Sequence, residues 1–241
     1  MRPRRIHFTL LCLTGVICAA SFVWRLSRAA PSWYNPPDVI SPEQARSAET
    51  VEYNFIQKFQ ELRPPAETWI LRVREYQLND WLAVRLPAWI AHDPSLDWPS
   101  ELGTPQLHID ETGVTLAVSV KQADTVRYVS ARLAPKLDDK GSIHVTIDRI
   151  SLGKLALPVD ASEYAVNLLS RTVASVQQKP DTVNAAQELL TAIINNQSVD
   201  AGFKLADDRR VRIKNITLAD GYMEITSCTL PAESTRSAKA E

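Results

Sequence analysis

The chain has 241 residues, of which 45% are hydrophobic and 23% charged, a composition typical of globular proteins rather than disordered ones. Its net charge of −1 hides an asymmetry, because the first 30 residues carry five arginines and no acid, whereas the remainder holds 22 basic and 28 acidic residues. An acidic remainder argues against binding to nucleic acid, which needs a basic face, and against attraction to anionic lipid headgroups by charge alone.

The N-terminal residues predict a membrane anchor. A basic start is followed by 17 uncharged residues, Phe8 to Trp24. A helix of that length rises about 25 Å, at the short end for a bilayer core, and the apolar residues on either side can extend it. We expect a signal-anchor at residues 1–28 with a single transmembrane span over residues 6–26. The C-terminal part is then expected outside the cytoplasm, at the cell membrane.

A cleaved signal peptide is the alternative interpretation of the same segment. Cys18-Ala19-Ala20 is a small-x-small triplet of the kind that signal peptidases cut. The apolar run continues past this triplet through Phe22, Val23 and Trp24, which favours an uncleaved anchor. Both interpretations export the C-terminal part.

A spacer and an amphipathic helix are expected next. Residues 29–40 contain three prolines and predict an extended linker. Ser41, Pro42 and Gln44 then form an N-cap, a first helical position and a capping-box partner. The apolar residues that follow are spaced by three and four: Ala45, Ala48, Val51, Phe55, Phe59 and Leu62. Residues 41–66 are therefore expected to form a helical arm with one apolar face.

The first half of the main domain, expected over residues 67–231, is mostly β-structure. Thr68–Arg74 predicts a strand, and Glu75–Leu82 a short helix that Pro87 ends, before an irregular stretch over residues 88–105. From Gln106 onwards, alternating strands are joined by tight turns that begin at the acids Asp110 and Asp138. The apolar phase slips by one residue near Ile150, which indicates a bulge or a bend.

The second half predicts two helical stretches and then more strands. Apolar stripes mark helices between residues 160 and 195, and strands are expected over residues 199–205, 211–218 and 222–230, before a disordered tail at residues 232–241. Since tight turns join the strands, the sheet is expected to be antiparallel. The predicted fold is α+β, with one curved antiparallel sheet packed on a helix pair, an N-terminal transmembrane helix and an extra amphipathic helix.

No pattern for enzymatic chemistry is found. The main domain has one cysteine, Cys228, no glycine-rich phosphate loop and no catalytic-serine or zinc-protease motif. His108 and His144 fall at polar positions of strands, so we expect exposed side chains rather than metal ligands. The paired acids lie in or beside turns and are expected to be solvated: Asp110-Glu111, Asp138-Asp139 and Asp207-Asp208. We predict no catalytic, metal-binding or cofactor-binding residue, and no enzyme.

Three segments carry a resemblance to a known family: Glu75–Leu82 after its strand, Ile150–Pro158, and the closing hairpin Val211–Tyr222. Together they resemble the YpmS-like family of bacterial membrane-anchored proteins and, more distantly, the tubular lipid-binding (TULIP-like) superfamily. The YpmS-like resemblance implies no catalytic residue. The tubular superfamily implies a curved sheet around a long helix and binding of lipid or another apolar ligand.

The expected function is therefore that of a membrane-anchored, non-catalytic binding module for lipid or another apolar ligand. The alternative is an envelope scaffold that uses the helical arm to contact a partner protein. Trp69, Trp81 and Trp89 are open to two interpretations, as core residues between helix and sheet or, for some of them, as part of an apolar groove. The groove would be lined by Trp69, Leu78, Trp81, Leu152, Leu155, Leu168, Leu169 and Val173.

Overall fold

The computed structural model describes residues 3–64, 66–92, 98–158, 197–205, 207 and 209–230. Within these residues the chain is α+β with antiparallel sheets, as predicted. The helices are α1 (Pro3–Arg28), α2 (Pro42–Gln60) and α3 (Glu75–His92). The strands are β1 (Thr68–Arg74), β2 (Gln106–Asp110), β3 (Gly113–Gln122), β4 (Thr125–Leu137), β5 (Ser142–Leu152), β6 (Leu155–Ala156), β7 (Ser198–Asp200), β8 (Gly202–Lys204), β9 (Arg210–Ala219) and β10 (Tyr222–Leu230). The helix pair predicted between residues 160 and 195, with Leu168, Leu169 and Val173, lies outside the described residues, as does the predicted tail.

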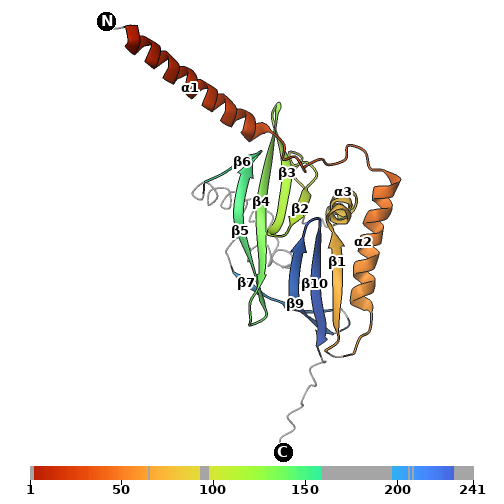
Figure 1. Ribbon diagram of the computed structural model, residues 1–241. Helices are drawn as coiled ribbons and strands as arrows, with labels where there is room; N and C mark the ends of the chain where they lie inside the picture. The colour runs from red at the N-terminus through yellow and green to blue at the C-terminus, as the bar shows by residue number, and fades with distance from the viewer. Residues whose placement is uncertain are drawn as a thin grey trace, which may run out of the picture.

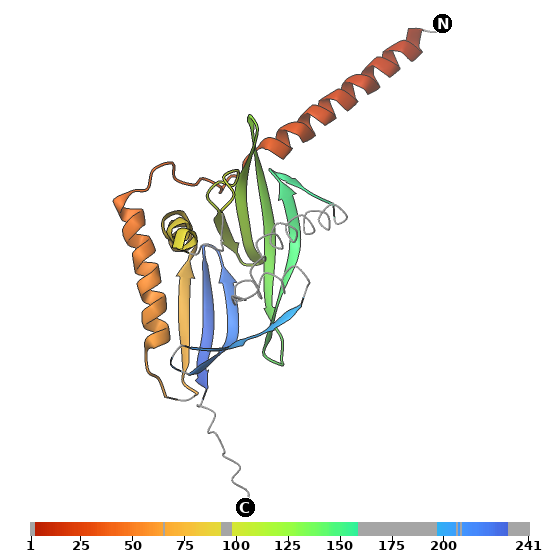
Figure 2. The same cartoon turned by 180° about the vertical axis from the view of Figure 1, so that it is seen from behind.

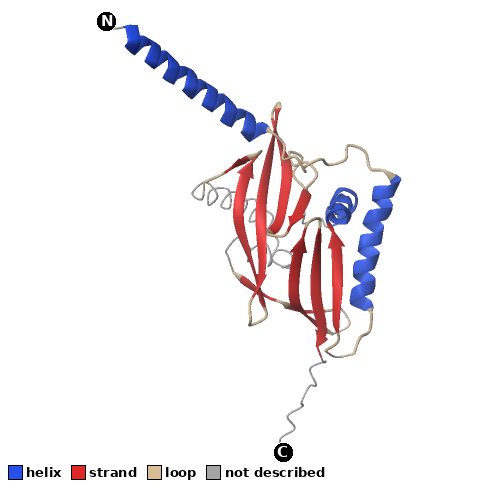
Figure 3. Ribbon diagram, in the orientation of Figure 1, coloured by secondary structure: helices blue, strands red, loops and turns tan. Residues whose placement is uncertain are grey.

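The strands form two sheets, so the prediction of one curved sheet is wrong (Figures 1 and 3). One sheet has the order β1-β10-β9-β8, and the other has the order β2-β3-β4-β5-β6 with β7 paired to β5. The run expected as a single strand over residues 199–205 is divided between them at Ala201. This buried residue donates its N–H to Gly141 O at 3.0 Å and accepts from Ile213 N at 2.9 Å. These two bonds hold the chain where it crosses from one sheet to the other.

The four-stranded sheet contributes a hydrophobic core on the side that faces α2. Alternate residues of β1 are buried, namely Trp69, Leu71 and Val73, as the period of two in a strand requires. Phe59 of α2 meets the Trp69 ring edge-on with centroids 5.4 Å apart. The apolar face predicted for the helical arm thus packs on this sheet, beside β1 in Figure 1.

Helix α2 begins with the predicted capping box. Ser41 Oγ accepts from Gln44 N at 3.2 Å, and Gln44 Oε1 accepts from Ser41 N at 3.0 Å. The helix packs against α3, and Glu52 pairs with Arg85 of α3 at 2.6 Å. The predicted arm therefore lies docked against the body of the protein.

Helix α3 is longer than predicted, because it continues through Pro87 to His92. A proline inside a helix removes one backbone hydrogen bond, which here is outweighed by the contacts of α3 with α2 and β2. Asn79 exchanges two hydrogen bonds with Leu107 of β2, at 2.8 and 2.9 Å, and Glu75 Oε2 accepts from Ile109 N at 2.8 Å. Side chains of α3 therefore form hydrogen bonds with backbone groups at the outer edge of β2, where a further strand would otherwise pair.

The predicted hairpin turns and the predicted bulge are confirmed. Asp110 Oδ1 accepts from Thr112 N at 2.8 Å in the β2–β3 turn. Between β4 and β5 the register passes from Arg132↔Arg149 to Leu133↔Ile147, which leaves Asp148 as the extra residue. This bulge explains the slip in apolar phase, because one inserted residue reverses the side-chain alternation.

Helix α1 projects away from the sheets, and only its C-terminal end contacts them (Figures 1 and 2). Lys154 N, in the β5–β6 turn, donates to Leu26 O at 2.9 Å. Gly153 beside it has φ of +60°, and a Cβ there would lie 2.7 Å from the backbone of Ser27. None of the helices in the described part of the chain combines the length and the apolar composition needed to cross a membrane.

The linker predicted as a spacer is packed on the six-stranded sheet, which corrects the expectation of a free extended segment. Tyr34 is buried, donates its hydroxyl to Thr104 O at 2.7 Å and accepts from Ser119 N at 3.0 Å. An aromatic residue with a bonded hydroxyl attaches the segment because it combines apolar burial with a satisfied polar end.

Candidate functional site

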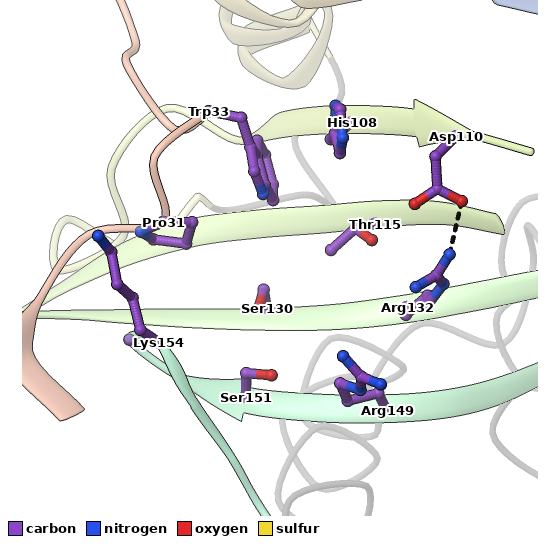
Figure 4. Close-up of a pocket in the computed structure, with 11 residues that line it drawn as sticks. Pro31, Trp33, His108, Asp110, Thr115, Ser130, Arg132, Arg149, Ser151 and Lys154 are labelled. Carbon is purple, nitrogen blue, oxygen red and sulfur yellow. Dashed lines mark hydrogen bonds and ion pairs between the residues drawn. The ribbon is translucent and has the colours of Figure 1, made fainter. Parts of the chain in front are cut away.

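A polar pocket of about 320 Å³ lies on one face of the six-stranded sheet, where the linker after α1 crosses it (Figure 4). Strands β2 to β5, the β5–β6 turn and the linker all contribute residues. The pocket is lined by Pro31, Trp33, His108, Asp110, Thr115, Ser130, Arg132, Arg149, Ser151, Gly153 and Lys154.

The register of the strands places the polar residues on this one face. His108 pairs with Thr115, Thr115 with Arg132, and Arg132 with Arg149, so these four form one row across four strands. Ser130 and Ser151 form the next row towards α1. Residues directly opposite one another in an antiparallel sheet share a face, so the row brings together groups far apart in sequence.

Arg132 is neutralised within the pocket by Asp110 at 2.5 Å (Figure 4). Burial alone would raise the pKa of Asp110, but the hydrogen bonds from Arg132 and Thr112 outweigh it and hold the pKa well below its usual range. Gly113 leaves room for this ion pair, because a Cβ there would lie 3.0 Å from Arg132 Nε and 2.8 Å from Leu133 O.

Arg149 is exposed and has no ion-pair partner among the described residues. It lies opposite Arg132, and like charges at opposing positions of a sheet repel each other. Lys154 is likewise exposed and unpaired within the described ranges. The lining therefore holds three cations and one carboxylate, in a domain whose overall charge is acidic.

Trp33 and His108 close one end of the pocket. Their rings stack 5.4 Å apart at 21°, and Glu75 Oε2 lies 3.0 Å from His108 Nδ1. The prediction of an exposed His108 is wrong, since its side chain is 31% exposed and held from both sides. The strand phase was correct, but the linker and α3 cover the position.

Acidic groups elsewhere behave as turn residues. Asp138 accepts from Ser142 N at 2.8 Å and from Lys140 N at 2.9 Å. The first of these bonds is the main cause that lowers the pKa of Asp138 from its ordinary value. Across the described residues, no three His, Cys, Asp or Glu side chains are grouped so that they could hold a metal ion.

Of the residues predicted to line an apolar groove, the five that the structure describes are not gathered into one site. Trp69 is 6% exposed and belongs to the core of the four-stranded sheet, and Leu78 packs against that core. Trp81 is half-buried on α3. Leu152 and Leu155 pair with each other across the β5–β6 turn of the other sheet. For Trp69 the core interpretation is therefore correct.

The pocket itself was not predicted, and Trp33, Arg132, Arg149 and Lys154 were not singled out. A signal was present, since Ser130 and Arg132 occupy the polar phase of their strand and Thr115 that of the strand before it. Aligning the two predicted strands from the turn between them would have placed Thr115, Ser130 and Arg132 on one face of the sheet.

Comparisons with protein-family models, with curated proteins and with solved structures find no match to this chain.

Proposed function

We propose that this chain is a membrane-anchored extracytoplasmic protein whose non-catalytic domain binds lipid at the bilayer surface. The main support for the proposal is the position of the polar pocket, which lies close to the end of α1. Pro31 and Trp33, two of its lining residues, follow the last residue of α1 by three and five positions.

The membrane part of the proposal rests on the sequence of residues 6–26 and on the projection of α1 from the body (Figure 2). Arg28 lies over the Trp24 ring, 4.0 Å from its centroid, and such an aromatic and basic pair suits the boundary between lipid and water. A span that ends there holds the pocket beside the headgroups, where a lipid can be gripped while its chains remain in the bilayer.

The contacts at the end of α1 support a fixed placement of the domain. The Lys154–Leu26 hydrogen bond and the packing of Gly153 on Ser27 join the β5–β6 turn to the helix. Tyr34 then fixes the linker six residues after α1. A domain held in this way presents one face to the membrane, unlike one on a flexible tether.

The experiment is to purify the full chain from membranes, exchange it into lipid-free neutral detergent and analyse an organic extract by mass spectrometry. A phospholipid retained in stoichiometric amount supports lipid binding, and a clean extract contradicts it. Terminal sequencing of the same sample tests the anchor, because a mature chain that begins at Ser21 would be a cleaved export product.

An envelope scaffold is the second candidate, favoured by the outer surface of α2. Tyr53 is 64% exposed there, with Ile56 and Leu62 also exposed nearby. Exposed apolar side chains on one element suit a protein partner. A partner captured by photo-crosslinking from position 53, together with a lipid-free extract, would favour this function over lipid binding.

A further inference from the structure

We infer that the polar pocket is a binding site for a phosphate group, held by Arg149 with help from Arg132, while Lys154 adds positive charge at the other end of the pocket, beside Pro31 (Figure 4). The inference rests on the proposed function only in naming a phospholipid as the source of that group. A free phosphate ester has the same chemistry. The charge, the hydrogen-bond donors and the shape of the pocket all suit such a group.

The charge of the pocket opposes that of the domain around it. Outside the first 30 residues the chain carries 28 acids against 22 bases, yet the pocket lining has one acid and three bases. The single acid, Asp110, is engaged by Arg132. Arg149 and Lys154 have no carboxylate partner among the described residues, so their charges are free to attract an anion.

The two arginines are arranged for one shared ligand. Arg132 and Arg149 occupy opposite positions on neighbouring strands, where Cβ atoms lie about 5 Å apart. Figure 4 shows both side chains in the same pocket, with Arg132 bonded to Asp110. An oxyanion placed between the two strands would contact both guanidinium groups. An anion there removes the repulsion between the two charges, which Asp110 relieves on one side only.

Hydroxyl groups complete the set of donors. Ser130, Ser151 and Thr115 line the same pocket, and none of their hydroxyls bonds to another described residue. Ser130 is 7% exposed, so its hydroxyl lies on the floor of the pocket. An accessible hydroxyl in the lining can donate a hydrogen bond to a ligand oxygen.

A phosphate group fits these donors better than a carboxylate does. Two guanidinium forks and three hydroxyls offer more hydrogen bonds than two carboxylate oxygens can accept. The volume of about 320 Å³ also exceeds a bare ion and lies at the lower end of the roughly 300 to 1,000 Å³ of ligand pockets. The pocket thus has room for the alcohol that a phosphate ester carries.

The test uses the full chain in neutral detergent at constant ionic strength. Inorganic phosphate is titrated against sodium chloride by calorimetry, and phosphatidic acid is compared with diacylglycerol of the same chains by native mass spectrometry. The variant Arg149→Gln removes one pocket charge. The control Lys136→Gln removes the same charge from the neighbouring strand β4, outside the pocket.

Wild type and Lys136→Gln are expected to bind phosphate or phosphatidic acid and not diacylglycerol, and Arg149→Gln to lose about tenfold in affinity. Equal binding by Arg149→Gln and wild type would overturn the inference, as would chloride acting as well as phosphate. Retention of lipid that does not depend on Arg149 overturns the phosphate site but leaves lipid binding standing. Arg149-dependent binding of inorganic phosphate without any lipid supports the site and removes the lipid function.

Discussion

Arg132 and Arg149 lie directly opposite each other on β4 and β5, and of these two only Arg132 has a carboxylate partner among the described residues, Asp110 at 2.5 Å. The pocket is therefore partly neutralised from within. Asp110 competes with any anion for Arg132, so its charge sets a limit on the affinity of the site. Removing the charge of Asp110 should therefore strengthen anion binding.

The substitution Asp110→Asn is expected to tighten phosphate binding by about threefold to tenfold, because it removes one negative charge while an amide oxygen can still accept from Thr112 N and Gly113 N. Calorimetric titration of the full chain with inorganic phosphate measures this change. Thr112→Ala is the control, since it disturbs the same turn and keeps the carboxylate. An unchanged or weaker affinity in a folded Asp110→Asn variant would show that Asp110 does not compete with the ligand.

Stability should fall in acid because of the turn carboxylates. The pKa values of Asp110 and Asp138 lie below their ordinary 3.8 in the folded protein. A lowered folded pKa contributes stability that is present above the unfolded pKa and is lost as pH falls towards the folded one. We expect the melting temperature to decrease below about pH 4, and to decrease less steeply in Asp110→Asn. Parallel pH profiles for the two proteins would contradict a contribution from Asp110.

Local features of the fold could be predicted because they depend on neighbouring residues. The capping box needs only Ser41 and Gln44, and the bulge at Asp148 shifts the apolar phase within a single strand. The two sheets could not be predicted in this way, because the division at Ala201 depends on hydrogen bonds to Gly141 and Ile213. Helix α3 extends beyond its expected end for a similar reason, since its contacts with other elements outweigh the hydrogen bond lost at Pro87.

The pocket depends on still more distant contacts. Arg149 lies opposite Arg132 only because the register of β4 and β5 shifts by one residue, between the Arg132↔Arg149 pair and the Leu133↔Ile147 pair. Trp33 joins the site only because Tyr34 binds the linker to the sheet. Neither relation is visible in the alternation of one strand, although both arginines were visible as polar residues.

The core interpretation of Trp69 predicts a large loss of stability. Trp69→Ala should lower the free energy of unfolding by about 3 to 5 kcal/mol, because it removes a buried ring that packs on Phe59 and leaves a cavity. Trp89→Ala is the matched control, since that ring is 56% exposed and should change stability by less than about 0.5 kcal/mol. Chemical denaturation followed by circular dichroism measures both. Equal small effects would mean that Trp69 lines an open space instead.

The junction between α1 and the domain depends on Gly153. Its φ of +60° disfavours any side chain, and a Cβ would lie 2.7 Å from the backbone of Ser27, which cannot rotate away as a side chain can. Gly153→Ala should therefore separate the β5–β6 turn from the end of α1 and weaken the Lys154–Leu26 hydrogen bond.

Gly221→Ala provides the control for this junction, because Gly221 has φ of +75° but no atom within 4 Å of the place that a Cβ would take. Both variants carry the cost of a left-handed alanine, about 1 kcal/mol, and only Gly153→Ala adds the clash. Trypsin digestion of the full chain in detergent measures the outcome, since Arg28 is the last residue of α1. We expect cleavage after Arg28 to be faster in Gly153→Ala than in Gly221→Ala or wild type. Equal rates in all three proteins would show that the domain is not held against the helix at this turn.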